Sequence, residues 1–201
     1  MRETVSLPEG DPYTMYRNFE PWYRLLDPAL CDPAGRYKRV HKGIATKVSA
    51  CINQAEHFHK QVLDEYYHPN TYVFFGEDED HLTYGSIRWS MRNRSGKALT
   101  PQQIKAAQLM EVPDGESRLV KVAGHGQGLE QNRFFELQPQ DAKGDGTVSP
   151  QSGSAPKGKP GVKRVFKTKG YDHQGSYNNK HMVRLTKYLI AKMVAEKESK
   201  C

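Results

Sequence analysis

Two short stretches decide how this chain is interpreted: Gly144-Asp145-Gly146-Thr147-Val148-Ser149 and Tyr171-Asp172-His173-Gln174-Gly175. Asp145 stands between two glycines, which permit a tight turn and the close approach of a neighbouring side chain. His173 follows 28 residues later, after a run that is typical of a β-strand. An acid and a histidine in that order match the last two members of a serine–acid–histidine triad. In such a triad the acid orients the imidazole, and the imidazole deprotonates the serine.

The pattern of apolar residues around these stretches predicts alternating helices and strands. Thr71–Gly76 is an uncharged β-branched and aromatic run, which indicates a buried strand of a parallel sheet. The elements expected along the chain are a short helix near 16–26 within an irregular lead-in over 1–38, a helix over 39–67 that Pro69 stops, strands at 71–76 and 86–91, an acidic loop at 77–80, a helix over 100–110, strands at 119–123 and 162–169, a flexible loop over 149–161, and a final helix capped by Asn178 or Asn179.

That order predicts an α/β fold. Residues 1–70 are expected to form an irregular lead-in and an amphipathic helix, and residues 71–201 to carry the acid and histidine loops. His173 then lies on the loop between the last strand and the last helix. Because ligands bind outside the carboxyl ends of the strands in open α/β sheets, that loop is a candidate site.

We interpret Asp145 as the orienting acid and His173 as the general base, since an unperturbed imidazole pKa near 6.5 suits proton transfer at neutral pH. Bland alternatives exist for both residues. Asp-Gly pairs are common in surface turns, and most single histidines are structural or exposed. Asp172 is the fallback acid, although adjacent side chains usually point apart.

Several strings together resemble the C-terminal third of lecithin:cholesterol acyltransferase-like lipases: YVFFG at 72–76, then Thr83, GDGTV at 144–148 and VFKTKGYDH at 165–173. The longer string YDHQGSYNN at 171–179 is more similar to bacterial type VI secretion phospholipase effectors. The resemblance spans about residues 72–195 and is loose before residue 70. It implies the C-terminal portion of an α/β-hydrolase sheet, with a mainly helical and irregular N-terminal region before it. It also implies that Asp145 matches the triad acid and His173 the triad base.

The chain departs from that family at the nucleophile, which the family carries on a G-x-S-x-G elbow. No such string is present; the nearest, GHGQG at 124–128, has glycine in place of serine and is expected to be a flexible loop. Ser149, Ser152, Ser154 and Ser176 lie near the two stretches but lack the elbow. We therefore expect a C-terminal fragment of a serine-type (phospho)lipase effector, which is a hydrolase. The fragment is expected to be inactive by itself because it supplies no nucleophile. Its implied partners are phospholipid or a membrane surface, an upstream segment carrying the nucleophile, and secretion or immunity proteins.

The net charge of +7 is concentrated at one end of the chain. Residues 155–201 hold 12 Lys and Arg against 3 Asp and Glu, whereas residues 1–154 hold 18 against 20. The alternative function is therefore a non-catalytic module that binds anionic lipid or a protein partner through this basic segment. A solvated loop and a lysine-rich helix face are the simpler explanation of the charge. Nucleic acid is not an expected partner, because the segment has little aromatic interleaving.

No cofactor or metal site is expected. His57 and His59 lie two residues apart and point to different faces of a helix, and residues 77–80 lack the spacing of a calcium loop. Cys31, Cys51 and Cys201 form no CxxC pair and are expected to be free thiols. With no signal-like N-terminus and no membrane-length apolar run, the chain is expected to be cytoplasmic as made. Export by a type VI-like route without a signal peptide is what the resemblance implies.

Overall fold

The computed structural model describes residues 2–7, 9–39, 43–64, 66–92, 98–123 and 130–198. It has mixed α and β structure and divides into two compact units, one of residues 1–64 and 86–138 and the other of residues 65–85 and 139–201. This division differs from the one expected at residue 70, because the chain leaves the second unit after residue 85 and returns at residue 139.

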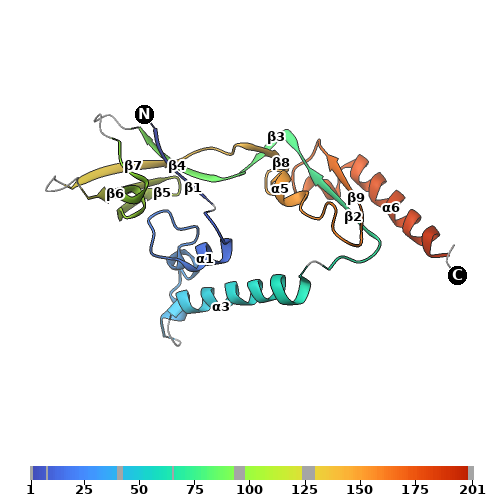
Figure 1. Cartoon of the computed structure of the whole chain (residues 1–201), viewed down its shortest axis with the longest axis horizontal. Coiled ribbons are helices and arrows are strands. Elements are labelled where there is room, and N and C mark those ends of the chain that lie inside the picture. Colours follow the sequence, from blue (N-terminus) through green and yellow to red (C-terminus); the bar gives the residue numbers. More distant parts are fainter. Residues whose placement is uncertain are drawn as a thin grey trace. The chain divides into compact units, whose positions relative to one another are not determined.

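The first unit contains a five-stranded antiparallel sheet of order β1-β4-β7-β6-β5 (Figure 1). Its core is centred on Trp22 and Phe135, whose ring centroids lie 4.5 Å apart. The buried indole N–H of Trp22 donates to the Ile104 carbonyl at 2.7 Å, so its one polar group is satisfied. The elements of this unit are β1 (Arg2–Leu7), α1 (Pro12–Arg17), α2 (Pro28–Cys31), η1 (Arg36–Arg39), α3 (Gly43–His57), η2 (Phe58–Leu63), β4 (Ile87–Arg92), α4 (Pro101–Lys105), β5 (Gln108–Asp114), β6 (Ser117–Val122) and β7 (Gln131–Leu137).

Two expectations for this unit were wrong in part. The lead-in is not wholly irregular, because β1 pairs with β4 along its whole length. Its apolar residues Val5 and Leu7 are buried, and so is Glu3, whose carboxylate accepts the N–H of Leu99 at 2.7 Å. The helix expected over 100–110 ends at Lys105, and the strand β5 follows.

Long helical structure was correctly predicted before residue 70, although its bounds are narrower. The α-helix α3 continues into the π-helical turn η2 and ends at Asp64, whose φ of 45° breaks the helix five residues before Pro69. In the described ranges, no helix combines the length and the hydropathy that crossing a bilayer requires.

The second unit is built on two strand pairs. Strands β2 and β9 pair in parallel, and β3 and β8 pair antiparallel. The long helix α6 follows at the C-terminal end, and the Tyr72 hydroxyl of β2 donates to the Glu196 carboxylate of α6 at 3.4 Å (Figure 1). The elements are β2 (Thr71–Gly76), β3 (Asp78–Thr83), β8 (Ala142–Gly144), α5 (Pro150–Gly153), β9 (Val162–Thr168), η3 (Gly175–Tyr177) and α6 (Lys180–Glu198).

The strands at 71–76 and 162–169 and the final helix were correctly predicted, including the cap. The Asn179 side-chain oxygen accepts the N–H groups of His181 and Met182 at 3.0 and 3.2 Å. Two loops were not. The acidic residues expected as a loop begin strand β3, and the Ser- and Pro-rich segment contains α5, for which the Ser149 hydroxyl is the N-cap.

Candidate active site

The candidate site forms where the strands of the second unit end. Because β2 and β9 run parallel, Gly76 and Thr168 pair at the same edge, and the Glu77 N–H donates to the Thr168 carbonyl at 2.9 Å. The loop carrying Asp145 meets this edge. A Cβ placed on Gly76 would lie 2.7 Å from the Asp145 Cβ, so the absence of a side chain at Gly76 is what admits the acid.

Asp145 is held in one orientation by three hydrogen bonds. Its Oδ1 accepts the backbone N–H groups of Thr147 at 3.0 Å and Val148 at 2.7 Å, and its Oδ2 faces His173. Burial raises the pKa of Asp145, but the hydrogen bonds from His173 and from the two N–H groups outweigh burial and set the pKa below its usual value. The carboxyl group is therefore ionised at neutral pH.

His173 meets Asp145 through both its ring and its backbone. Nδ1 lies 2.9 Å from the Asp145 Oδ2, and the His173 N–H donates to the Asp145 carbonyl at 2.7 Å. Since an ionised carboxylate can only accept, the proton of the ring contact resides on Nδ1. In the neutral form of the ring Nε2 is then the nitrogen with the lone pair, and the side chain is 48% exposed. The arrangement leaves Nε2 able to accept a proton.

Thr83 and two glycines determine the shape of the loop that carries Asp145. Thr83 is buried, and its hydroxyl donates to the Thr147 carbonyl at 3.1 Å. A Cβ on Gly144 would lie 2.5 Å from the Thr83 Cγ2, and Gly146 adopts a φ of 83°. These contacts explain why the loop needs glycine on both sides of Asp145 and a small β-branched residue beneath it.

The other residues considered as acid or nucleophile make local contacts. The Asp172 carboxylate accepts the N–H of Gly175 at 2.5 Å, within its own turn. The Ser176 hydroxyl donates to the His173 carbonyl at 2.9 Å, the Ser154 hydroxyl donates to the Gln151 carbonyl at 3.4 Å, and the Ser149 hydroxyl accepts the Ser152 N–H at 3.3 Å. The string at 124–128 lies outside the described residues, as does Cys201, whereas Cys31 and Cys51 are exposed free thiols.

A buried tyrosine, Tyr171, lies between the end of strand β9 and His173. The hydroxyl groups of Tyr171 and Thr168 are hydrogen-bonded, and the Thr168 hydroxyl lies 2.7 Å from the Phe75 carbonyl. Burial raises the pKa of Tyr171, with Asp145 adding to that effect, while the hydrogen bond with Thr168 opposes it. Tyr171 therefore stays neutral and ties the end of β9 to β2.

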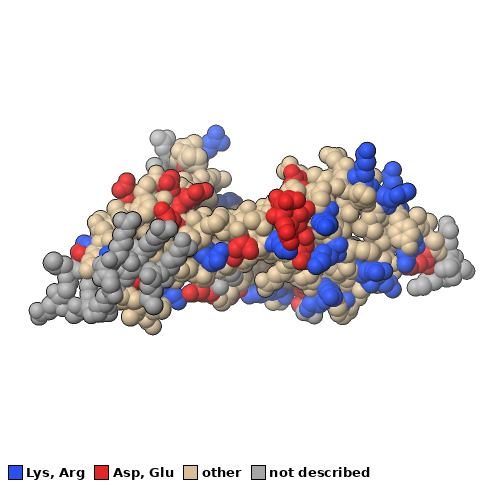
Figure 2. Space-filling view, turned by 90° about the horizontal axis from the view of Figure 1, so that it is seen from above, with Lys and Arg blue, Asp and Glu red and all other residues tan. Residues whose placement is uncertain are grey.

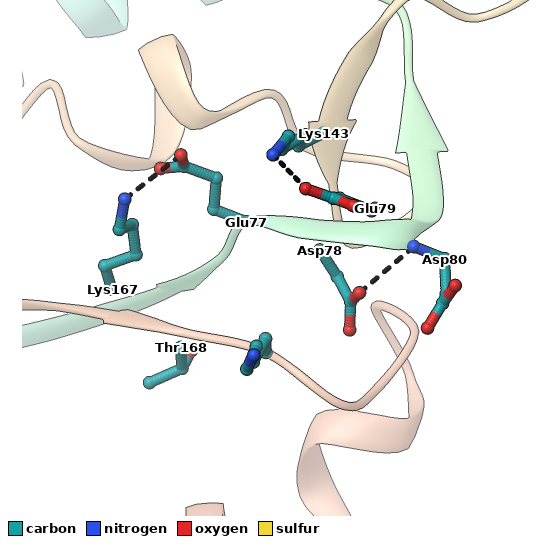
Figure 3. A pocket seen from close by; sticks show the side chains of 8 residues that line it. Glu77, Asp78, Glu79, Asp80, Lys143, Lys167 and Thr168 are labelled. Carbon is teal, nitrogen blue, oxygen red and sulfur yellow. Dashed lines mark hydrogen bonds and ion pairs between the residues drawn. The ribbon is translucent and has the colours of Figure 1, made fainter.

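A pocket of about 530 Å³ opens beside this edge, lined by residues 77–80, 167–169 and Lys143 (Figure 3). Ion pairs occupy much of its rim: Lys167 bonds Glu77 at 3.2 Å, and Lys143 bonds Glu79. Across the part of the chain that the structure describes, no group of three or more His, Cys, Asp or Glu residues is placed to hold a metal ion. Lysines thus pair with Glu77 and Glu79, and backbone N–H groups donate to Asp78.

Comparison with family models gives no match, and comparison with curated proteins gives none. A solved chain from the crystal structure of the Tle4–Tli4 complex does match, with a TM-score of 0.55 and 21% identity. The match covers 90% of this chain and 37% of that chain, so this chain spans little more than a third of the length of the chain it matches. The similarity shows the fold, which is part of an α/β-hydrolase-like fold with a mostly antiparallel sheet and few helices.

The sequence thus identified the two residues that the fold brings into contact, Asp145 and His173. It did not identify Asp78, which was treated as one of four acids in a solvated loop. The Asp78 side chain is largely buried and accepts the N–H of Gly170 at 2.6 Å, in the loop that leads to His173. No local sequence signal distinguishes Asp78 from its acidic neighbours.

Proposed function

We propose that this chain supplies the acid and the base of a serine-type lipase effector of the type VI secretion class, and that the serine comes from a segment outside these 201 residues. One observation carries the proposal: Asp145 contacts Nδ1 of His173 at 2.9 Å while the rest of its carboxylate is fixed by backbone N–H groups. The resemblance of GDGTV and DHQGSYNN to such effectors and the fold of the Tle4–Tli4 chain support the same assignment.

In the proposed reaction a serine hydroxyl attacks the ester carbonyl of a lipid, and Nε2 of His173 takes the hydroxyl proton. Asp145 holds the imidazole in the Nδ1–H tautomer and stabilises the imidazolium that forms. His173 then gives the proton to the departing alcohol. Water, deprotonated by the same Nε2, finally hydrolyses the acyl-serine, which releases the fatty acid.

The proposal extends to partners and location. The outside segment carries a G-x-S-x-G elbow and completes the sheet, and a phospholipid is the ester substrate. The chain is made in the cytoplasm and exported by a type VI-like route. Because the matched structure is a Tle4–Tli4 complex, we also propose an immunity protein as a partner.

Two phospholipid hydrolysis assays test this function. The purified chain alone should not release fatty acid, since its sequence contains no G-x-S-x-G elbow to present a serine. The chain joined to the segment encoded immediately upstream should release it, and His173→Ala or Asp145→Asn should reduce kcat by about 10³-fold or more. Hydrolysis by the chain alone that His173→Ala abolishes would contradict the outside nucleophile. Full activity of either variant in the joined form would contradict the assigned roles.

The basic segment favours a second candidate function, a module that binds anionic lipid without catalysis. Residues 155–201 carry a net +9, and Figure 2 shows Lys and Arg side chains spread over the right-hand part of the surface, where the second unit lies. Lys157, Lys163 and Arg164 are exposed. Each basic residue near an anionic membrane contributes about 1 kcal/mol, which is screened by salt.

Co-sedimentation with vesicles tests this candidate. A lipid-binding module should bind vesicles containing phosphatidylglycerol but not pure phosphatidylcholine vesicles, and the triple variant Lys157→Gln, Lys163→Gln, Arg164→Gln should weaken binding about tenfold or more. Asp145→Asn and His173→Ala serve as controls and should bind as wild type. Equal binding by the triple variant would contradict the module.

A further inference from the structure

The loop that carries His173 is held at Gly170 from two sides. The Gly170 N–H donates to Oδ2 of Asp78 at 2.6 Å, and the Gly170 carbonyl accepts from the Asn179 side-chain amide at 3.0 Å. Gly170 has a φ of 88°, a conformation that side chains rarely adopt. The N–H and the carbonyl of Gly170 are therefore both hydrogen-bonded, three residues before His173.

Asp78 also connects this loop to the loop of the acid. Its backbone pairs with Gly144, the residue before Asp145, in the β3–β8 ladder. Its Oδ1 accepts the Asp80 N–H at 3.0 Å, which leaves Oδ2 directed at Gly170. Figure 3 shows the Asp78 carboxylate pointing from β3 at the loop that follows Thr168.

Because His173 is exposed, the hydrogen bonds that hold Gly170 affect where its imidazole lies. Because 48% of its side chain is exposed, packing alone does not fix the imidazole. Its position depends on Asp145 and on the path of residues 169–173. A loop released at Gly170 would keep the Asp145 carboxylate in place, since Thr147 and Val148 hold it. The imidazole would be held less firmly, because its backbone would depend on the His173 N–H bond to the Asp145 carbonyl.

We propose that Asp78 is the positioning residue of the acid–base pair: its backbone aligns the Asp145 loop, and its carboxylate holds the His173 loop through Gly170. This inference rests on the proposed function only for its catalytic meaning. The N–H groups of Asp80 and Gly170 lower the pKa of Asp78 more than burial raises it, so the carboxylate is ionised and both oxygens accept.

Two variants each remove one of the two hydrogen bonds that hold Gly170. Asp78→Asn keeps the size of the side chain but replaces one acceptor with an N–H₂ donor, which repels a backbone N–H. Asn179→Asp keeps the cap on α6, because its oxygen still accepts from His181 and Met182, but loses the donor to Gly170. Asp80→Asn is the matched control, since Asp80 is exposed on the same strand and undergoes the same change of charge.

The measurement is the ¹H–¹⁵N NMR signal of the His173 Nδ1–H in the full chain labelled at histidine, assigned by its loss in His173→Gln. Wild type and Asp80→Asn should show a downfield, slowly exchanging Nδ1 proton. Asp78→Asn and Asn179→Asp should lose that signal or exchange it about tenfold faster, which corresponds to about 1.4 kcal/mol, at temperatures where circular dichroism shows a folded chain.

The outcomes separate this inference from the proposed function. If wild type shows the signal and Asp78→Asn retains it unchanged while folded, Asp78 is not a positioning residue. If wild type lacks the signal, the Asp145–His173 contact itself is contradicted, and the proposed function fails with it. In the joined, active form, Asp78→Asn should lower kcat and leave KM within about twofold, because loop position affects proton transfer rather than substrate binding.

Discussion

At the scale of single residues, the contacts of Asp145 show how a loop fixes the orientation of a carboxylate and keeps it ionised. Its Oδ1 accepts two backbone N–H groups and its Oδ2 accepts from His173, so every strong contact favours the ionised form. The same contacts make Asp145 a pH-dependent source of stability. Its pKa in the folded chain lies below the ordinary value of 3.8.

Because the folded pKa is lowered, the unfolded chain binds this proton more tightly than the folded chain does. Ionised Asp145 therefore stabilises the fold above pH 3.8, and this contribution is lost as pH falls through the folded pKa. Asp145→Asn should reduce the free energy of unfolding by about 1–3 kcal/mol at pH 7. The difference should shrink as pH falls below 3.8 in urea titrations. A difference that does not change between pH 7 and acid pH would contradict an ionised, hydrogen-bonded carboxylate.

At the scale of elements, sequence patterns predicted those that combine a long apolar run with clear boundaries. The strand Thr71–Gly76 has an uncharged run closed by glycine, and α6 has an asparagine cap and a periodic apolar face, so both were recognisable. Strand β3 was missed because its first three residues, DED, are typical of a solvated turn. The β8 residues with which it pairs lie about 60 positions away, and Gly170, which donates to Asp78, lies 92 positions away, so no local pattern records these contacts.

Strand β1 illustrates a different limit. Val5 and Leu7 alternate with polar residues, which favours a strand, but Glu3 on the same face breaks the apolar pattern. The N–H of Leu99 donates to one oxygen of that carboxylate across 96 residues, which offsets part of the cost of burying it. The contact between Asp145 and His173 was predicted because the short strings around the two residues are specific. The residues that support them, Asp78 among them, were not, since their role arises only in three dimensions.

The junction of β2 with the acid loop offers a direct test at this scale. Gly76→Ala should place a methyl group 2.7 Å from the Asp145 Cβ and 3.3 Å from the Gly144 carbonyl oxygen, so the acid loop must shift. We expect a loss of about 1–3 kcal/mol in stability, as for other overpacked sites, together with loss of the His173 Nδ1–H signal. Gly115→Ala is the control, because no atom lies within 4 Å of its Cβ position and its φ is ordinary. An intact signal in Gly76→Ala would show that the loop accommodates the methyl group.

At the scale of the whole molecule, the hydrophobic core of the first unit contains none of the residues of the candidate site. Both tryptophans of the sequence, Trp22 and Trp89, are buried in that core, with Val120, Val122 and Phe135 at its centre. Asp145 and His173 belong to the second unit. Tryptophan fluorescence therefore reports the first unit, and the imidazole signal reports the second.

This division predicts the effect of a core substitution. Phe135→Ala removes a fully buried ring that contacts Trp22, and it should destabilise the tryptophan-detected transition by about 3–5 kcal/mol. Phe134→Ala is the neighbouring control, since 46% of that residue is exposed, and its effect should be much smaller. Denaturant titration followed by fluorescence measures both. Similar losses in the two variants would contradict the assigned core.

The composition of β2 has a practical consequence for any experiment on this chain. Strand β9 has three basic residues along its length, which discourage pairing with another chain, whereas β2 is TYVFFG and, in the described ranges, pairs with β9 alone. An uncharged strand with one open edge recruits extended peptides, including copies of itself, and forms aggregates more readily as the solution becomes more concentrated. A dilution series therefore belongs beside every binding or activity measurement, because a signal that rises steeply with protein concentration reports self-association through this edge.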